Sequence, residues 1–397
     1  MKEWIKGSIA AFAVVCLFAL PAAAVADASP KNNEKPVEKH HEEKHHHGKG
    51  YYEEEHHTFQ NHCVTDYDEP RYRKADCGTA CDPCGTNLNF NPSNFTFISS
   101  SLFWATCTNN LDFAVSAESF DGEAEEFTIT GAEVHSVELD YDYGFRFTGV
   151  YQFPCDCWEL RLSWTHFNPS HSRNVSTEDT GVDTVFVIGP TGVFKEADFI
   201  TAHYKLEYNV FDLTLGKECC LCDKFSIRPY AGARFVWMDQ KFRIRLEGSN
   251  FAESGSFDNW KADYTAGGIV GGIEGHVDIG CDFYLWGNFA ASAVAGKLEM
   301  DQEINYASGG PNGITTENGD DPECIIATNF EAAMGIGYRF AYGCFDMDWR
   351  LAYEFVTWDN VPEANRYFDN FRVSSTTGGK HGSIGLHGVT LTTTTRF

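Results

Sequence analysis

The chain has 397 residues, of which 15% are aromatic, 36 are glycine and only 5 are methionine. Aromatic side chains favour strands and glycine favours tight turns, so this composition predicts a large β domain rather than a helical one. The formal net charge of −27 excludes a nucleic-acid partner, because phosphate binding needs a basic face.

Residues 1–26 have the features of a signal peptide. Lys2 and Lys6 supply a basic start, residues 7–20 form an apolar run, and the small residues at 24–26 predict cleavage before Asp27. No later stretch reaches the ~18–20 unbroken apolar residues that a membrane helix needs. We therefore expect an exported chain that can enter a membrane only as a barrel.

Residues 27–95 differ from the rest of the chain. They are rich in Lys, Glu and His and poor in apolar residues, so we expect a disordered extension rather than a packed domain. Imidazole and thiolate groups bind zinc or copper, and His62 lies near a Cys-x3-Cys-x2-Cys arrangement that begins at Cys77. In an exported chain we favour a solvated tail whose thiols form disulfides, and we assign no metal and no cofactor.

From about residue 97 apolar and polar residues alternate with a period of two. Near residue 140, Tyr141, Tyr143 and Phe145 alternate with Asp142 and Arg146. Successive side chains of a strand point to opposite faces, so one face is apolar and the other charged. Ten such segments are present, at 97–107, 134–151, 157–167, 197–213, 224–246, 260–279, 282–300, 325–341, 344–358 and 382–397.

The connections between these segments alternate in length. An even strand number with short turns on one rim and long links on the other is typical of outer-membrane barrels, whose short turns face the periplasm. A change of phase near Gly267 and Gly268 predicts a β-bulge. The expected fold is all-β: a transmembrane antiparallel β-barrel of about ten strands over residues 96–397, with a disordered periplasmic extension over residues 27–95.

Several strand sequences resemble a known family. Residues 97–117, which contain SLFWA at 101–105 and DFA at 112–114, are similar to the first strand of the Legionella-type major outer-membrane pore proteins. YDYGFR at 141–146, YNVFDL at 208–213 and IRPYAGAR at 227–234 resemble further segments of that family. The resemblance spans about residues 97–397 and implies a pore-forming outer-membrane barrel. Related proteins occur in Chlamydia-like bacteria, whose cysteine-rich envelopes are cross-linked by disulfides. The His-rich extension departs from the family pattern.

The last segment alternates through Val389, Leu391 and Thr393 and ends at Phe397. This ending resembles the signal that the barrel-insertion machinery reads. We therefore expect that machinery and outer-membrane lipid as partners. Related porins are often trimers, but no residue here marks a subunit interface, so a homo-oligomer is left open.

The charged strand faces predict a passage for small hydrophilic solutes. A charge that faces lipid costs up to ~2–4 kcal/mol at the bilayer midplane, so these side chains should face water or one another. Opposed rows of acids and bases would then create a transverse field across the pore. We expect the pore to be lined by Glu138, Asp140, Asp142, Arg146, Glu159, Arg161, Lys205, Glu207, Arg228, Arg234, Glu274, Arg339 and Arg350.

Two other functions fit the same pattern. Ten strands enclose a narrow interior, so the charges could neutralise one another in a plugged lumen, which would leave a structural or adhesive surface protein. Less favoured is an outer-membrane hydrolase, with His166 or His171 near Asp179 and Asp183. No G-x-S-x-G, H-E-x-x-H or phosphate-loop motif is present, and we expect no enzyme.

Of the 14 cysteines, only Cys16 is removed with the signal peptide, which leaves an odd number. In an exported protein this predicts disulfides and either a free thiol or a bond to another molecule, such as a cysteine-rich envelope protein. Cys219 and Cys220 are adjacent and do not easily pair with each other. A cross-linked network and plain internal disulfides both stay open. The candidates on the short-turn side are Cys63, Cys77, Cys81, Cys84, Cys155, Cys157, Cys219, Cys220, Cys222, Cys281 and Cys344.

Overall fold

A computed structural model describes the β domain and its outer loops in part. The described residues are 94–108, 111–117, 119–121, 128–130, 133–153, 158–176, 184–188, 194–222, 224–248, 256–306, 314–319, 322–342, 345–363 and 381–396. The predicted signal peptide, residues 27–93 of the predicted extension and the predicted insertion signal Phe397 lie outside them.

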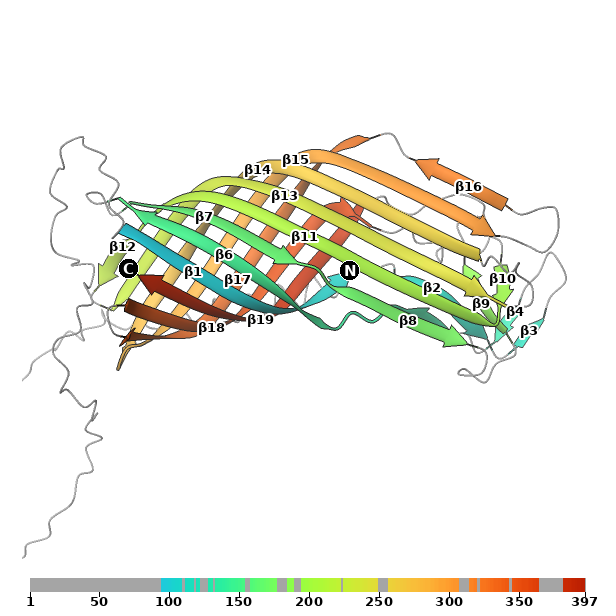
Figure 1. Ribbon diagram of the computed structural model, residues 1–397, viewed down its shortest axis with the longest axis horizontal. Coiled ribbons are helices and arrows are strands. Elements are labelled where there is room, and N and C mark those ends of the chain that lie inside the picture. The colour runs from blue at the N-terminus through green and yellow to red at the C-terminus, as the bar shows by residue number, and fades with distance from the viewer. Residues whose placement is uncertain are drawn as a thin grey trace, which may run out of the picture. The chain divides into compact units, whose positions relative to one another are not determined.

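Ten long antiparallel strands form a closed barrel (Figure 1). In barrel order they are β1 (Phe95–Thr108), β6 (Tyr141–Gln152), β7 (Trp158–Phe167), β11 (Phe199–Lys217), β13 (Phe225–Glu247), β14 (Ser256–Gly280), β15 (Phe283–Tyr306), β17 (Glu323–Tyr342), β18 (Phe345–Pro362) and β19 (His381–Arg396). Each pairs with the next, and β19 pairs with β1 to close the sheet. The all-β class, the strand number and the antiparallel barrel are therefore confirmed. Within the described ranges, no helix is both long and apolar enough to cross a membrane.

Shorter strands extend the barrel at both rims. β8 (Ser170–Ser176) pairs with the outer half of β11, β16 (Ile314–Gly319) pairs with β15, and β12 (Cys219–Cys222) pairs with the start of β13. At the long-loop end, β2 (Asp112–Ala117), β5 (Glu133–Ser136), β9 (Thr184–Ile188) and β10 (Phe194–Ala197) form a four-stranded sheet, and β3 (Ser119–Asp121) pairs with β4 (Thr128–Thr130) (Figure 1).

The inner and outer faces of the barrel exchange their chemistry along the strands. In the outer half of β11 the inward residues are apolar, as with Leu206 and Tyr208, and the residue between them, Glu207, faces outward. Beyond residue 210 the chemistry of the two faces is reversed. Asp212 points inward, and Leu213, which is 45% exposed, points outward. The alternation is unbroken, so only the identity of the apolar face changes.

This exchange replaces the β-bulge predicted near Gly267 and Gly268. The two glycines pair in unbroken register with Phe235 and Arg234 of β13, so that prediction is wrong. The apparent phase change in the sequence arises because apolar residues lie on the inner face before Gly267 and on the outer face after it, where Ile269 is 72% exposed.

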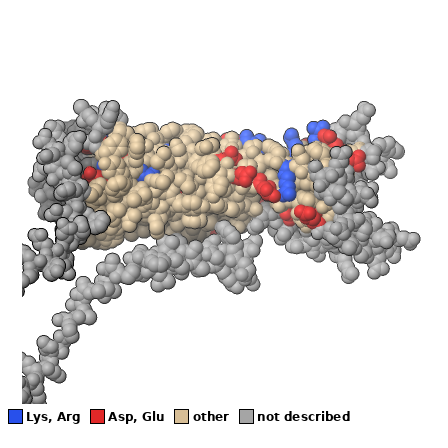
Figure 2. Space-filling view, turned by 90° about the horizontal axis from the view of Figure 1, so that it is seen from below, with Lys and Arg blue, Asp and Glu red and all other residues tan. Residues whose placement is uncertain are grey.

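An apolar belt surrounds the barrel on the side of the short turns. Its outward side chains are large and exposed; they include Leu162, Leu213, Phe235, Ile269, Phe330, Met334, Leu351, Phe355 and Leu391. Figure 2 shows that the middle of one barrel face is almost free of charged side chains, which gather nearer the long-loop end. An exposed apolar surface this extensive is stable only against hydrocarbon, so the belt marks the part of the barrel that lies in the membrane.

The turn between β14 and β15 is a two-residue hairpin. Cys281 and Asp282 both have positive φ, 54° and 63°, and Gly280 before them has φ of 102°. Positive φ at both central positions is typical of a type I′ turn, whose twist matches that of the strands it joins. Short hairpins of this kind set the register of the strands at this rim.

We expect mild acid to loosen the four-stranded outer sheet. His135 of β5 is 5% exposed, and its Nε2 lies 2.8 Å from Ser116 Oγ of β2. Burial lowers the pKa of His135, Glu133 opposes this shift and Arg173 adds to it. The unfolded sheet therefore binds more protons than the folded one just below pH 6.5, the ordinary pKa of histidine. The stability contributed by the neutral ring is complete above that pH and falls as the pH drops towards the folded pKa.

Amide hydrogen exchange in β2 and β5, corrected for the intrinsic effect of pH, measures this loss. Exchange should accelerate between pH 7.5 and 5.5 in the wild type and stay constant in His135→Gln. Equal protection of the wild-type strands at both pH values would contradict the role of His135.

Candidate functional site

The lumen at the level of the apolar belt is lined by arginines and carboxylates. The inward arginines in the described part of the barrel at this level are Arg146, Arg161, Arg228, Arg234, Arg339 and Arg350. All but Arg350 form ion pairs with carboxylates on neighbouring or facing strands. The Arg350 guanidinium lies 3.9 Å from the centre of the Trp286 ring. Charged side chains thus line much of the lumen where the outer face meets lipid.

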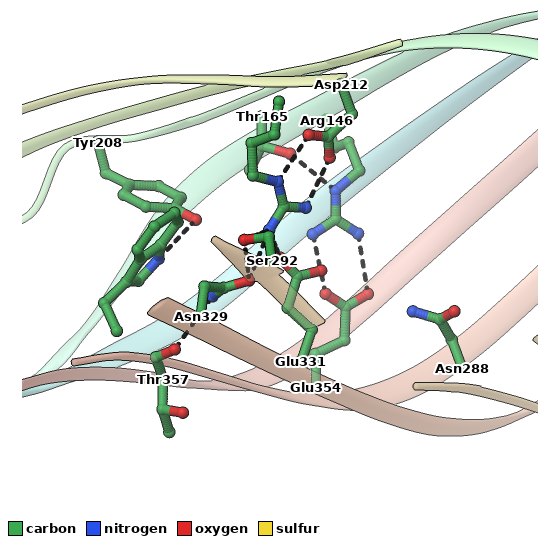
Figure 3. A network of polar contacts seen from close by, with 12 residues as sticks. Arg146, Thr165, Tyr208, Asp212, Asn288, Ser292, Asn329, Glu331, Glu354 and Thr357 are labelled. Atoms are coloured by element: carbon green, nitrogen blue, oxygen red, sulfur yellow. Dashed lines mark hydrogen bonds and ion pairs between the residues drawn. The ribbon is translucent and has the colours of Figure 1, made fainter. Parts of the chain in front are cut away.

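The network nearest the outer half of the barrel has two arginines at its centre (Figure 3). Arg146 of β6 binds both carboxylate oxygens of Glu354 on β18, at 3.1 and 3.0 Å. Arg234 of β13 binds both oxygens of Asp212 on β11 at 2.7 Å, and its Nη1 lies 2.6 Å from Glu331 of β17. Two strands lie between Arg146 and Glu354, and two between Arg234 and Glu331, so these bonds cross the lumen.

A second network lies closer to the short-turn rim. Arg161 of β7 pairs with Glu159 on its own strand and with Glu274 of β14, both at 2.9 Å. Arg228 of β13 pairs with the same two carboxylates at 2.8 and 3.1 Å. Two cations and two anions therefore alternate around one point, which neutralises all four within the lumen.

A third cluster lies at the mouth of the barrel on the short-turn side. Arg339 of β17 pairs with Asp278 of β14 at 2.9 Å, and its guanidinium lies 4.5 Å from the centre of the Tyr284 ring. The Tyr284 hydroxyl donates to Asp348 of β18, and the His276 ring stacks on Tyr284 at 4.1 Å. Arg339 also contacts His276.

Two inward glycines make room for side chains that reach across a neighbouring strand. A Cβ at Gly337 would lie 2.1 Å from the Tyr284 ring, which passes over this glycine of β17 to reach Asp348 on β18. A Cβ at Gly216 of β11 would lie 2.7 Å from the guanidinium of Arg228, which passes over it to reach Glu159 on β7. The absence of a side chain at both positions is therefore a condition for the ion-pair networks.

A dry aromatic layer closes the lumen above the charged networks. Trp358 Nε1 donates to Tyr208 Oη at 3.2 Å, and the two rings lie 6.3 Å apart. Tyr208 is on β11 and Trp358 on β18, so four strands separate them in either direction around the barrel. The two side chains, joined by one hydrogen bond, thus reach across the full width of the lumen. Tyr208 is 3% exposed and Trp358 is 0% exposed, so water does not reach this layer.

The charged networks retain contact with water through some of their members, whereas Arg234 and Arg228 are only 3% and 7% exposed. The Arg146, Arg161 and Arg339 side chains are 22–24% exposed, although they point into the barrel. The carboxylates of Asp212 and Glu331 are each 20% exposed. The membrane-level lumen is therefore polar and partly hydrated, and the aromatic layer separates it from the outer half of the barrel.

Nine of the thirteen predicted pore-lining residues lie on the inner face of the barrel; they are Asp142, Arg146, Glu159, Arg161, Arg228, Arg234, Glu274, Arg339 and Arg350. Lys205 and Glu207 instead lie on the outer face of β11, because the inward side chains at that height are apolar. Glu138 and Asp140 precede β6 and are exposed, and Glu138 pairs with Arg173 of β8.

The two closure residues were not predicted from the sequence. Tyr208 lies in the apolar phase of its segment, opposite the predicted pore-lining residues Lys205 and Glu207. Trp358 lies in the same phase as Arg350 but was not singled out. Asp212 was missed although a signal existed. It continues the inward phase of Tyr208 and Val210, and it is the first acid on that face.

The histidines considered for hydrolysis lie apart from each other. His166 Nδ1 lies 2.8 Å from Asn209 Oδ1, and His171 Nε2 lies 2.9 Å from Asp142 Oδ2. Asp179 and Asp183 are outside the described residues. Throughout the described ranges, no group of three or more His, Cys, Asp or Glu side chains is placed to hold a metal ion.

The described cysteines lie at both rims. Cys219 and Cys222 on the short-turn rim are free thiols, and Cys222 is exposed. Cys107 and Cys324, nearer the long-loop side, are also free. Cys220 and Cys281 are not among these free thiols. The remaining disulfide candidates, at positions 63, 77, 81, 84, 155, 157 and 344, lie outside the described residues.

Comparisons with known proteins give a family match. The family model described as Legionella pneumophila major outer membrane protein precursor matches residues 90–395. The comparison with curated proteins gave no match. Among solved structures, the Escherichia coli outer membrane protease OmpT is 13% identical with a TM-score of 0.39, and the match covers 78% of this chain and 99% of that chain. The P. putida toluene transporter TodX is 8% identical with a TM-score of 0.32, and the match covers 77% of this chain and 92% of that chain. Neither likeness carries a functional argument.

We expect Glu354→Gln to destabilise the barrel by about 3 kcal/mol, because it leaves Arg146 charged in the lumen without its bidentate partner. The double variant Arg146→Met with Glu354→Met should recover most of that loss. The midpoint of urea unfolding, followed by the gel mobility of the folded barrel, measures both.

The matched control is Glu138→Gln, which breaks a pair whose carboxylate side chain is 78% exposed. Such a pair contributes at most about 1 kcal/mol. Equal losses in Glu354→Gln and Glu138→Gln would show that the lumen networks do not stabilise the barrel.

Proposed function

Because the chain belongs to the Legionella major outer membrane protein family and forms an outer-membrane barrel, we propose that it is a passive, non-enzymatic channel for small hydrophilic solutes. The hydrated, charged lumen at the level of the apolar belt carries this proposal. The exposed fractions of Arg146, Asp212 and Glu331 support it, since they mean that water-sized particles reach these groups inside the barrel.

The channel is narrow and closed at rest in this proposal. Ion pairs that cross the lumen, such as Arg146 with Glu354, leave little room for large solutes. The side chains of the aromatic layer are shielded from water, and hydrophobic constrictions of this kind gate channels by excluding water. Conduction therefore requires Trp358 and Tyr208 to separate, which breaks one hydrogen bond between opposite walls.

The charged networks supply selectivity. Paired guanidinium and carboxylate groups place strong, opposed charges a few ångströms apart, so a solute that passes must exchange its water for contacts with both signs. Small polar or zwitterionic solutes meet this condition better than apolar ones. The near balance of charge around Arg161 and Arg228 favours weak rather than strong ion selectivity.

A structural or adhesive barrel is the alternative. The hydrogen bond between Trp358 and Tyr208 favours it, because a direct bond across the lumen is what a permanent plug would have. The two functions differ in one respect: a structural barrel stays closed when this bond is removed, whereas the channel opens.

Trp358→Ala should raise the single-channel current of the purified protein several-fold in planar lipid bilayers, because it removes the ring that meets Tyr208. Tyr208→Phe keeps the ring and loses the hydrogen bond, so it should open more often without a larger current. The control is Trp349→Ala, because Trp349 is 52% exposed on the lipid face of the same strand and should leave the current unchanged.

Current steps of the same size and frequency in Trp358→Ala and in the wild type would remove the aromatic layer as the gate. No steps in any of these variants, with folded protein in the bilayer, would favour the structural role.

We also propose that the protein is linked by disulfides to other envelope proteins. The exposed free thiol of Cys222 on the short-turn rim supports this role, because short turns face the oxidising periplasm. Whole envelopes run without reductant should show high-molecular-weight bands that a reductant collapses to the monomer, and Cys222→Ser should weaken them. Identical monomer bands with and without reductant would contradict the linkage.

A further inference from the structure

The outer wall of the barrel carries a basic patch just beyond the apolar belt. The patch consists of His203 and Lys205 on β11 and Lys241 and Arg243 on β13. Lys205 lies directly opposite Lys241, and His203 lies directly opposite Arg243. Lys241 and Arg243 are exposed, and the other two are half-buried. Two lysines therefore face each other on adjacent strands, and an arginine lies beside them, opposite a histidine whose pKa is lowered by burial and by the neighbouring cations.

Lys205, Lys241 and Arg243 lack the ion pairs that nearby cations have. Lys297 pairs with Glu299, and Arg245 pairs with Glu247. Lys205 and Lys241 have no ion pair to any described residue. The described partner of Arg243 is neutral: its Nε donates to Asn259 Oδ1 at 2.7 Å. Like charges directly opposite each other destabilise a sheet, so a bound anion would relieve the patch.

A groove lies between this patch and the apolar belt. It is lined by Trp164, Glu207, Asn209, Phe211, Trp237 and Asp239. Its floor is aromatic: Trp164 stacks on Phe211 with ring centres 5.6 Å apart, and Phe211 meets Trp237 edge-on at 5.4 Å. Its other end is polar and reaches Glu207 and Asp239, which are two residues from Lys205 and Lys241. The groove is therefore aromatic at one end and carries two carboxylates at the other, with the cations of the patch just beyond those carboxylates, an arrangement that fits an amphiphile with a hydroxylated, anionic headgroup.

The patch lies at the height of lipid headgroups. Lys241 is four residues beyond Trp237 on β13, and at ~3.3 Å per residue with a tilt of ~45° this is about 9 Å along the membrane normal. Tryptophan is enriched at the edge of the hydrocarbon, and the headgroup zone beyond it is about 5–7 Å thick. The backbone of Lys241 thus lies slightly beyond the headgroup zone, and long lysine and arginine side chains can bend back into it.

We propose that this surface binds a membrane lipid whose headgroup carries phosphate. The phosphate contacts Lys205, Lys241 and Arg243, and the apolar part of the lipid packs on the aromatic floor of the groove. Glu207 and Asp239 accept hydrogen bonds from headgroup hydroxyls, which favours a hydroxylated headgroup over a bare phosphate ion. The assignment depends on the apolar belt and the patch and is independent of channel activity.

Native mass spectrometry of the full-length barrel in detergent tests the proposal. The probes are lipid A, lipid A from which the phosphates have been removed, and inorganic phosphate. The wild type should bind lipid A and bind the dephosphorylated lipid much more weakly. Lys241→Gln with Arg243→Gln should weaken lipid A binding about thirtyfold, because each cation near an anionic headgroup contributes about fivefold, or ~1 kcal/mol.

Two controls separate lost charge from lost structure. Lys241→Arg with Arg243→Lys keeps the charge and should keep binding. Lys297→Gln removes a cation that already has a partner and should change binding by less than about twofold. Equal binding of both lipids by the wild type, or full binding by the Gln double variant, would overturn the proposal. Inorganic phosphate that displaces lipid A completely would show that the site binds a free anion instead.

Discussion

The structure depends on one constraint: side chains that face hydrocarbon must be apolar, and those that face water must not form a large apolar surface. A barrel longer than the bilayer is thick must meet the first condition over part of its wall and the second over the rest. β11 shows the result in one strand, with Asp212 inside where Leu213 faces lipid and Leu206 inside where Glu207 faces water. The lumen networks and the aromatic layer both follow from that exchange.

The membrane-level half and the outer half are consequently held together by different forces. Ion pairs such as Arg234 with Asp212 cross-link the walls where the interior is hydrated. Packing of buried side chains such as Tyr204, Leu206 and Met238 holds the walls where it is dry. The two regions meet at Arg146, whose guanidinium lies 5.5 Å from the centre of the Trp104 ring. Arg146 therefore belongs to the charged network and also contacts one of the buried aromatic side chains of the outer half.

The period-two pattern was enough to predict the fold, because each of the ten segments keeps a strict alternation whichever face is apolar. It was not enough to predict which face is inside. Lys205 and Arg234 look equivalent in the sequence, since each is a charge between apolar neighbours, yet Lys205 lies outside and Arg234 inside. Only their height relative to the bilayer distinguishes them, and that height is set by closure of the sheet. The partners of Arg146 and Arg234 could not be predicted for the same reason, because they come from strands far apart in the chain.

The charged outer wall of the projecting half also constrains how the barrel assembles. Lys241, Arg243 and Asp263 end beyond the membrane, so each must cross the hydrocarbon during insertion, at a transient cost of up to ~2–4 kcal/mol for every side chain that passes the midplane. The sum over β13, β14 and β15 makes unaided entry into a bilayer slow. Lys241 has no ion pair to a described residue and the described partner of Arg243 is neutral, so a route that shields these cations from hydrocarbon during insertion would lower that barrier.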